Sequence, residues 1–196
     1  MPRGRPKEFV REEALAAALG TFWEHGYAAT GLADLTESMG IGRQSLYDTF
    51  GDKRALFMEA LAAYCDRQAE MVGEMLSGDD PPGQRLARFL DSWVELLSSE
   101  LVHGCMVVNS IGDFAASDDV EMLDAVKGHI ARIEGLFARV IQQAIDSGEI
   151  DVGLSAREVT RTVMAAADGI VTRARIEDVR PKARDVSRSL KRLLGL

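Results

Sequence analysis

Hydrophobic residues recur along most of the chain at spacings of three and four, the period that places them on one face of an α-helix. In the first such segment, at about 11–25, Leu15, Leu19 and Phe22 form an apolar stripe, and Gly26 marks its end. No segment alternates hydrophobic and polar residues convincingly enough to predict a strand, and no stretch repeats at a fixed period. The pattern therefore predicts an all-α fold.

Glycines, prolines and capping residues divide this pattern into about nine helices. The clearest break is the sequence GDDPPG at 78–83, and the clearest start is a capping box formed by Ser155 and Glu158. The helix that starts near position 53 has a length of about 38 Å. The expected helices lie at about 11–25, 32–39, 43–50, 53–77, 84–99, 103–116, 119–147, 156–178 and 182–194.

Residues 26–53 form the most specific pattern in the chain, two short helices on either side of a tight turn that contains glycine. In the first helix Leu35 and Met39 share an inward face. Between the helices Ile41 provides an apolar contact inside the sequence GIG, whose glycines accept the backbone angles of a tight turn. This arrangement is typical of a helix-turn-helix, which lays its second helix in the major groove of DNA.

The second helix, at about 43–50, has the side-chain chemistry that a DNA groove requires. Leu46 and Phe50 share one face and are expected to pack inward. The polar residues then point away, where Arg suits guanine, Gln suits adenine, and hydroxyl groups suit phosphates or base edges. The outward candidates are Arg43, Gln44, Ser45, Tyr47 and Thr49.

Three motifs in this region, F-x-x-x-G-Y at 22–27, T-x-L-x-D-L at 30–35 and G-I-x-x-x-S-L-Y-x-x-F-x-x-K at 40–53, resemble the TetR family of bacterial transcriptional regulators. The resemblance covers about the first quarter of the chain. It implies an N-terminal three-helix helix-turn-helix head, joined by a long helix to a C-terminal helical bundle for ligand binding and dimerisation. It implies phosphate contacts by Thr30, Tyr47 and Lys53, and base or phosphate contacts by Arg43, Gln44, Ser45 and Thr49.

Two residues depart from the family pattern. Gly42 stands where a Ser or Thr cap is common, and Asp48 stands where a neutral or basic residue is usual. Asp48 would repel phosphate unless it accepts a hydrogen bond from a cytosine amino group or pairs with a base such as Arg54. The operator sequence therefore cannot be inferred from the resemblance.

The first residues, PRGRPK at 2–7, form a short basic arm whose prolines disfavour a helix. We expect Arg3 and Arg5 to enter an A·T-rich minor groove, and the alternative is a solvated tail. Residues 1–11 carry four basic residues and one acid, a sum of +3, although the whole chain has a net charge of −8. DNA binding is therefore expected to depend on this local charge and strongly on salt.

The breaks in the pattern divide the chain into two parts, and the resemblance implies what each part does. Residues 1–52 are expected to form the basic arm and the helix-turn-helix DNA-binding domain. Residues 53–196 are expected to form a helical effector-binding and dimerisation domain, which the long helix near position 53 begins.

Composition excludes several other classes of protein. The chain has 46% hydrophobic residues, no signal peptide and no apolar run of about 20 residues, so we expect a cytoplasmic protein with no membrane partner. It has no nucleophile elbow, phosphate loop or metal-binding motif, so we expect no catalytic residues, no enzyme activity, no cofactor and no metal. Two cysteines are too few for a disulfide scaffold.

The last long helix has a face of small and β-branched residues that predicts a homodimer. Small residues let helices approach closely, and two helices from each subunit can form a four-helix interface. Such a dimer places two recognition helices on one face of the duplex, so the operator is expected to be an inverted repeat. The alternative is that this face packs inside its own subunit. The expected interface residues are Val159, Val163, Ala166, Ala167, Ile170 and Ala174.

Apolar residues of the bundle are candidates for an effector pocket, because the resemblance implies that this domain binds a small molecule. Methionine-rich walls adapt to varied ligands, although the same residues also suit an ordinary core. His103, Asp113, His129 and Asp168 are further polar candidates. The expected pocket residues are Trp93, Leu97, Cys105, Met106, Asn109, Phe114, Phe137 and Met164.

Cys105 supports a separate hypothesis. A thiol beside Gly104 and two residues from His103 is a candidate for reaction with electrophiles or oxidants, and such a reaction would switch DNA binding off. The competing interpretation, which base rates favour, is a small buried core residue.

The sequence thus predicts a DNA-binding repressor that binds its inverted-repeat operator as a homodimer and is released by a small-molecule effector. A transcriptional activator on the same scaffold and a repressor switched through Cys105 are the alternatives.

Overall fold

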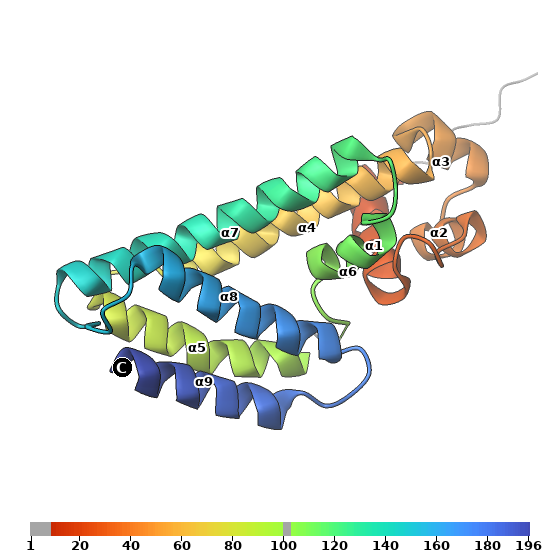
Figure 1. Cartoon of the computed structure of the whole chain (residues 1–196). Coiled ribbons are helices and arrows are strands. Elements are labelled where there is room, and N and C mark those ends of the chain that lie inside the picture. The colour runs from red at the N-terminus through yellow and green to blue at the C-terminus, as the bar shows by residue number, and fades with distance from the viewer. Residues whose placement is uncertain (1–8, 100–102) are drawn as a thin grey trace, which may run out of the picture. The chain divides into compact units, whose positions relative to one another are not determined.

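The computed structural model describes residues 9–99 and 103–196, which form nine α-helices and no strand (Figure 1). The predicted all-α fold is therefore confirmed. The helices are α1 (Arg11–His25), α2 (Leu32–Met39), α3 (Arg43–Phe50), α4 (Lys53–Met75), α5 (Pro82–Ser99), α6 (Met106–Phe114), α7 (Val120–Asp146), α8 (Ala156–Arg173) and α9 (Arg180–Leu194).

The chain divides into two compact units, with the boundary after Tyr64. Helix α4 is continuous across this boundary, so it contributes its first turns to the first unit and its remaining turns to the second. This boundary differs from the expected one before position 53, because the contacts of Phe57 and Glu59 with α1 assign the start of α4 to the first unit.

The first unit has a small aromatic and aliphatic core. Helix α1 packs on α2, and α2 packs on α3. The ring of Phe22 meets that of Phe57 edge to face at 4.9 Å between centroids, which ties α1 to α4. Less than 5% of the side chain is exposed for Phe22, Leu35, Leu46, Phe50, Leu56 and Phe57.

The turn between α2 and α3 has the backbone geometry that its glycine permits. Gly40 ends α2 in the left-handed region, with φ +65°, and its N–H donates to the carbonyl of Glu37. The N–H of Ile41 donates to the carbonyl of Thr36, and the Ile41 side chain is buried. The chain then starts α3 at Gly42, which offers no side-chain cap.

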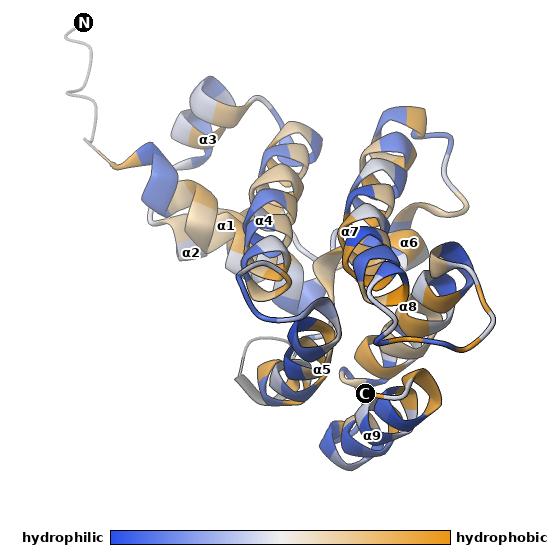
Figure 2. Cartoon of the chain, turned by 90° about the vertical axis from the view of Figure 1, so that its left-hand side faces the viewer, coloured by the Kyte–Doolittle hydropathy of each residue, from blue (hydrophilic) through white to orange (hydrophobic). Residues whose placement is uncertain are grey.

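The second unit is a helical bundle. Helix α7 packs against α5, α6 and α8, while α9 packs against α5 and α8 (Figure 1). The helices carry hydrophobic residues on one side and hydrophilic residues on the other (Figure 2), as their periodicity predicts. None of the helices in the described part of the chain has the length and apolar content to cross a membrane.

Helices α6 and α8 are shorter than the sequence analysis predicted. The expected helix at 156–178 ends at Arg173, because the chain turns over 174–176, where the N–H groups of Ile176 and Glu177 both donate to the carbonyl of Arg173. Just before α9, Asp178 accepts hydrogen bonds from Nε and from the backbone N–H of Arg180, and these bonds, the side-chain one first, lower the pKa of Asp178 to about 2. The expected helix at 103–116 begins only at Met106, because Gly104 before it has φ +76°.

Gly104 holds the loop before α6 close to α8. A Cβ atom at this position would lie 2.9 Å from the carbonyl oxygen of Val171, and φ is in the region that favours glycine. We expect Gly104→Ala to lower the free energy of unfolding by about 1–3 kcal/mol. Urea denaturation followed by circular dichroism measures this change.

Gly112→Ala is the matched control for that substitution, because Gly112 lies in α6 and a Cβ there would meet open space. Alanine is the better helix former, so this variant should gain about 0.5–1 kcal/mol. Equal effects of the two substitutions would contradict the close contact at Gly104.

Candidate nucleic-acid interface and ligand cavity

Helix α3 presents an exposed polar surface because two residues anchor its other side. Leu46 is fully buried and Phe50 is 4% exposed. The side chains that this leaves exposed are Arg43, Gln44, Tyr47 and Asp48, which we call the α3 surface. The other two predicted contacts on α3, Ser45 and Thr49, are half-buried.

Gln44 and Asp48 form a pair on the α3 surface. Nε2 of Gln44 donates a hydrogen bond of 2.8 Å to Oδ1 of Asp48, one turn further along the helix. The Gln44 amide therefore has one donor engaged, while its carbonyl oxygen and the second carboxylate oxygen of Asp48 are acceptors. Such a pair suits the amino groups of cytosine or adenine in the major groove and is repelled by a phosphate.

Lys53 is positioned by a residue that the sequence analysis did not assign to the site. Its Nζ lies 4.4 Å from the centroid of the Tyr27 ring, a cation–π contact. Tyr27 packs in turn on Phe57, with 4.9 Å between centroids. The sequence signal that could have identified Tyr27 is its place in the F-x-x-x-G-Y motif. Its ring lies beside Lys53, the first residue of α4.

The structure gives Thr30 a different place from the one expected. Its side chain is 1% exposed, and its hydroxyl donates a 2.7 Å hydrogen bond to the carbonyl of Gly26. The expectation of a phosphate contact by this hydroxyl is therefore corrected to a structural role before α2. Arg3 and Arg5 lie outside the described residues.

Arg11, which the sequence analysis counted in the basic charge near the N-terminus, is neutralised. Its Nη2 lies 2.5 Å from Oε2 of Glu59, and its guanidinium stacks over the Phe50 ring at 4.8 Å. This residue therefore packs α1 against α3 and α4 within the first unit.

The second unit contains a largely apolar cavity of about 100 Å³. Of the expected pocket residues, Trp93, Cys105, Phe137 and Met164 line this cavity. Leu97, Met106 and Phe114 are buried elsewhere in the core, while Asn109 donates from Nδ2 to the carbonyl of His103. The remaining wall is formed by Gln68, Met71, Val72, Phe89, Leu90, Leu96, Val107, Val108, His129, Ile130, Ile133, Val163, Ala167, Asp168, Val171 and Leu190.

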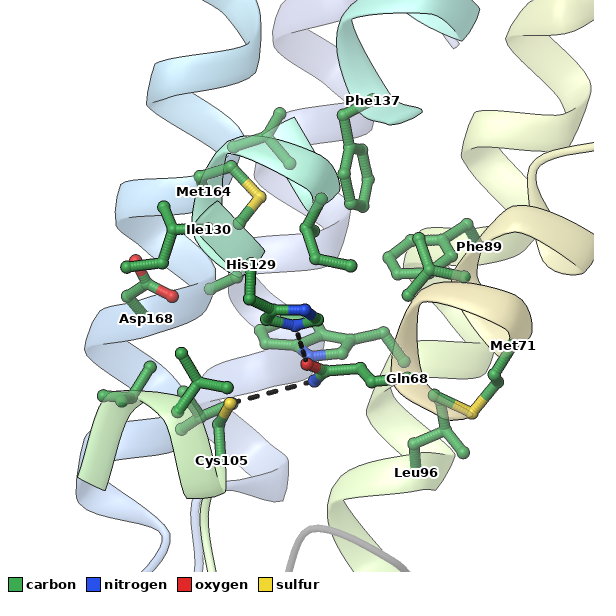
Figure 3. A pocket seen from close by; sticks show the side chains of 18 of the residues that line it. Gln68, Met71, Phe89, Leu96, Cys105, His129, Ile130, Phe137, Met164 and Asp168 are labelled. Carbon is green, nitrogen blue, oxygen red and sulfur yellow. Dashed lines mark hydrogen bonds between the residues drawn. The ribbon is translucent and has the colours of Figure 1, made fainter. Parts of the chain in front are cut away.

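Three polar side chains are linked across this cavity. Nε2 of His129 lies 2.7 Å from Oε1 of Gln68, and Nε2 of Gln68 donates to Sγ of Cys105 at 3.8 Å (Figure 3). Gln68 was not among the pocket residues expected from the sequence. The sequence signal that could have identified it is its position four residues after Tyr64 and three before Met71, which places a polar side chain on an apolar face of α4.

Burial controls the charges near the cavity. The pKa of His129 lies below its ordinary value, first because the ring is buried and second because Arg132 is close. The pKa of Asp168 is raised by partial desolvation and by the charge of Glu134. Burial, with a smaller effect of Cys105, raises the pKa of the Cys65 thiol to about 12, so Cys65 stays protonated at neutral pH.

The expected dimer face of α8 lies mostly inside its own unit. Val159, Val163 and Ile170 are at most 7% exposed, and Val163 and Ala167 line the cavity. These residues follow the helical period of a core face, so a single subunit already covers them. Ala166 and Ala174 are half-buried, and the opposite stripe exposes Thr162, Ala165, Gly169 and Thr172.

Both units match known protein families. Residues 14–60 match the family model described as bacterial regulatory proteins, tetR family. Residues 82–190 match the model described as tetracyclin repressor-like, C-terminal domain. Together these matches include most of the described chain.

Individual proteins show the same relationship. The chain is 32% identical to the HTH-type transcriptional regulator YezE of Bacillus subtilis (strain 168), over 76% of each chain. It is 32% identical to the HTH-type transcriptional repressor ComR of Escherichia coli (strain K12), over 76% of this chain and 71% of ComR. A solved structure of a cysteine mutant of the TetR family transcriptional regulator CifR, complexed with 26-bp double-strand operator DNA, is 28% identical with a TM-score of 0.82. That match covers 96% of this chain and 98% of CifR.

Proposed function

The chain belongs to the TetR family of bacterial regulatory proteins, and from that membership we propose that it is a repressor released from its operator by a small molecule. The observation that carries the proposal is the α3 surface, where Arg43, Gln44 and Tyr47 are exposed on a helix anchored by Leu46 and Phe50. The similarity to a regulator solved on operator DNA, over nearly the whole chain, supports it.

A mobility-shift assay with the DNA upstream of its own gene tests DNA binding. We expect Arg43→Ala to weaken the complex by about tenfold or more in each half-site, because one bidentate base contact contributes about 1–3 kcal/mol. Arg139→Ala is the matched control, since Arg139 is exposed on α7 in the second unit. Equal affinity of wild-type protein and Arg43→Ala would remove the α3 surface from the interface.

We further propose a homodimer, with the exposed stripe of α8 at its interface in place of the buried face. Thr162, Ala165 and Gly169 are small, so helices can approach closely along this stripe. Ile176 and Leu193, 84% and 70% exposed, are large apolar residues of the same bundle that a partner would cover. Sedimentation as a monomer at micromolar concentration would exclude this dimer and the inverted-repeat operator with it.

Helix α4 provides a physical route for release. Its first turns carry Lys53 beside Tyr27, and its later turns carry Gln68 and Met71 in the cavity wall. A ligand shifts a conformational equilibrium only when it binds one conformation better than the other. An effector that selects one position of this continuous helix would therefore change the population able to bind DNA.

The two alternatives to a ligand-released repressor that the sequence leaves open can each be tested separately. An activator on the same scaffold would raise transcription from the target promoter, so a promoter-reporter assay gives the sign of regulation.

A switch at Cys105 has one observation in its favour, since its thiol lines the cavity although it is only 8% exposed. An electrophile would have to enter the cavity to form a carbon–sulfur bond, and Cys105→Ser with an unchanged response to electrophiles or oxidants would exclude this switch.

A further inference from the structure

One buried polar atom in the cavity wall has no hydrogen-bond partner in the described part of the chain. His129 is 6% exposed and lines the cavity, and its Nδ1 is the atom that lacks a partner. Most of the surrounding wall is apolar, with Trp93 and Phe137 among its residues. Buried polar atoms are almost always hydrogen-bonded in native proteins, so an atom left without a partner beside a cavity indicates a ligand group.

The hydrogen bonds of Gln68 determine whether Nδ1 of His129 donates or accepts a hydrogen bond. The Gln68 amide donates through Nε2 to Cys105 and therefore offers its Oε1 to His129. Nε2 of His129 must then carry the ring proton, since a carbonyl oxygen only accepts. In a neutral imidazole the other nitrogen, Nδ1, is an acceptor and needs a donor from its partner.

Burial, together with the charged groups nearby, keeps the His129 ring neutral at pH 7. Arg132, one turn further along α7, forms an ion pair with Asp66 of α4 at 2.7 Å. Burial is the larger cause that lowers the pKa of His129, and Arg132 adds to it against the opposing charge of Asp66. From the other elements, Cys105 and Asp168 also line the cavity.

We propose that the cavity binds a small, largely apolar alcohol whose hydroxyl donates a hydrogen bond to Nδ1 of His129. This inference rests on the proposed function in taking the cavity as the effector site. Its volume of about 100 Å³ is smaller than the roughly 150 Å³ of an apolar cavity that binds benzene, so a six-membered ring fits only when the wall widens. Met71 and Met164 in the wall supply side chains that adapt to such a ring.

Three six-membered rings of similar shape test the proposal. Cyclohexanol can donate a hydrogen bond, cyclohexanone can only accept one, and methylcyclohexane can do neither. Binding is measured without DNA by tryptophan fluorescence in the full-length Trp23→Phe variant, whose remaining tryptophan, Trp93, lies in the cavity wall. We expect cyclohexanol to bind about tenfold more tightly than either of the other two compounds.

Two further measurements separate recognition from a structural role of His129. In His129→Leu the preference for cyclohexanol should fall to within about twofold, whereas the control His25→Leu, exposed at the end of α1, should keep it. In the protein with the native histidine, the preference should shift toward cyclohexanone as the pH falls below the pKa of His129, because protonated Nδ1 becomes a donor. The pH measurement holds even if His129→Leu does not fold.

Several outcomes would overturn the proposal. It is wrong if cyclohexanone binds more tightly than cyclohexanol at pH 7. It is also wrong if all three compounds bind equally, or if none of them binds. Because these measurements contain no DNA, such a result leaves the proposed regulator intact when the mobility shift is positive. Selective binding of cyclohexanol with no mobility shift would instead support the ligand site and contradict the regulator.

Discussion

Raising the salt concentration from 50 to 200 mM is expected to weaken operator binding by about 10⁴-fold. The proposed contacts use four basic side chains in each subunit, Arg3, Arg5, Arg43 and Lys53. In a dimer these make about eight phosphate or groove contacts, so the slope of log K against log salt is about −7. The effect is large because counterions released from DNA provide much of the binding free energy.

A titration of mobility shift or fluorescence anisotropy across this salt range measures the slope. The double variant Arg3→Ala/Arg5→Ala removes four of the eight charges from the dimer and should reduce the slope to about −3.6. A neutral pair of substitutions elsewhere in the N-terminal arm, Pro2→Ala/Pro6→Ala, is the matched control and should leave the slope near −7. A slope near zero for wild-type protein would contradict electrostatic docking.

The acidic remainder of the chain makes this test more specific. Residues 61–196 carry sixteen basic residues against twenty-two acids, a difference of −6. Residues 1–8 carry three basic residues against one acid, a sum of +2, without Arg11, which is paired with Glu59. An acidic body is repelled by DNA, so only the orientation that presents the basic arm and the α3 surface is attracted. The affinity for the operator should therefore fall as the salt concentration rises, and nonspecific DNA binding should not rise to compensate.

The first three helices could be predicted closely from the sequence because their ends carry strong local signals. Gly26 and Gly40 follow α1 and α2 immediately, and α3 lies between Gly42 and Gly51. The end of α8 could not be predicted in the same way. No glycine marks its end, and the chain leaves α8 through a turn over 174–176, in which the N–H of Ile176 donates to the carbonyl of Arg173.

The cavity and the dimer face were harder to predict from the sequence, because helical periodicity identifies an apolar face without showing which neighbouring element covers it. Leu97 and Phe114 have the same chemistry as Phe137, yet only Phe137 borders the cavity. Val159 and Val163 likewise form an apolar stripe, and the fold covers that stripe within one subunit. Gln68 is the opposite case, a polar side chain whose place on an apolar face was itself the signal.

Replacing Leu46 by alanine is expected to abolish operator binding through loss of α3. Leu46 is fully buried, and it holds an eight-residue helix that would not be stable alone. A Leu→Ala change in such a site costs about 2–5 kcal/mol, a large fraction of the roughly 5–15 kcal/mol by which a domain is stable. The expected result is a lower unfolding temperature for the first unit and an affinity for the operator reduced by about 100-fold or more.

Circular dichroism and mobility shift measure the two effects, and Leu154→Ala is the matched control. Leu154 lies before α8 and is 49% exposed, so its removal should change stability by less than about 0.5 kcal/mol and leave DNA binding unchanged. Cyclohexanol binding should be preserved in Leu46→Ala, because the cavity lies wholly in the second unit. Undiminished operator binding by Leu46→Ala would mean that α3 does not depend on this packing, and the α3 surface would lose its role as the recognition element.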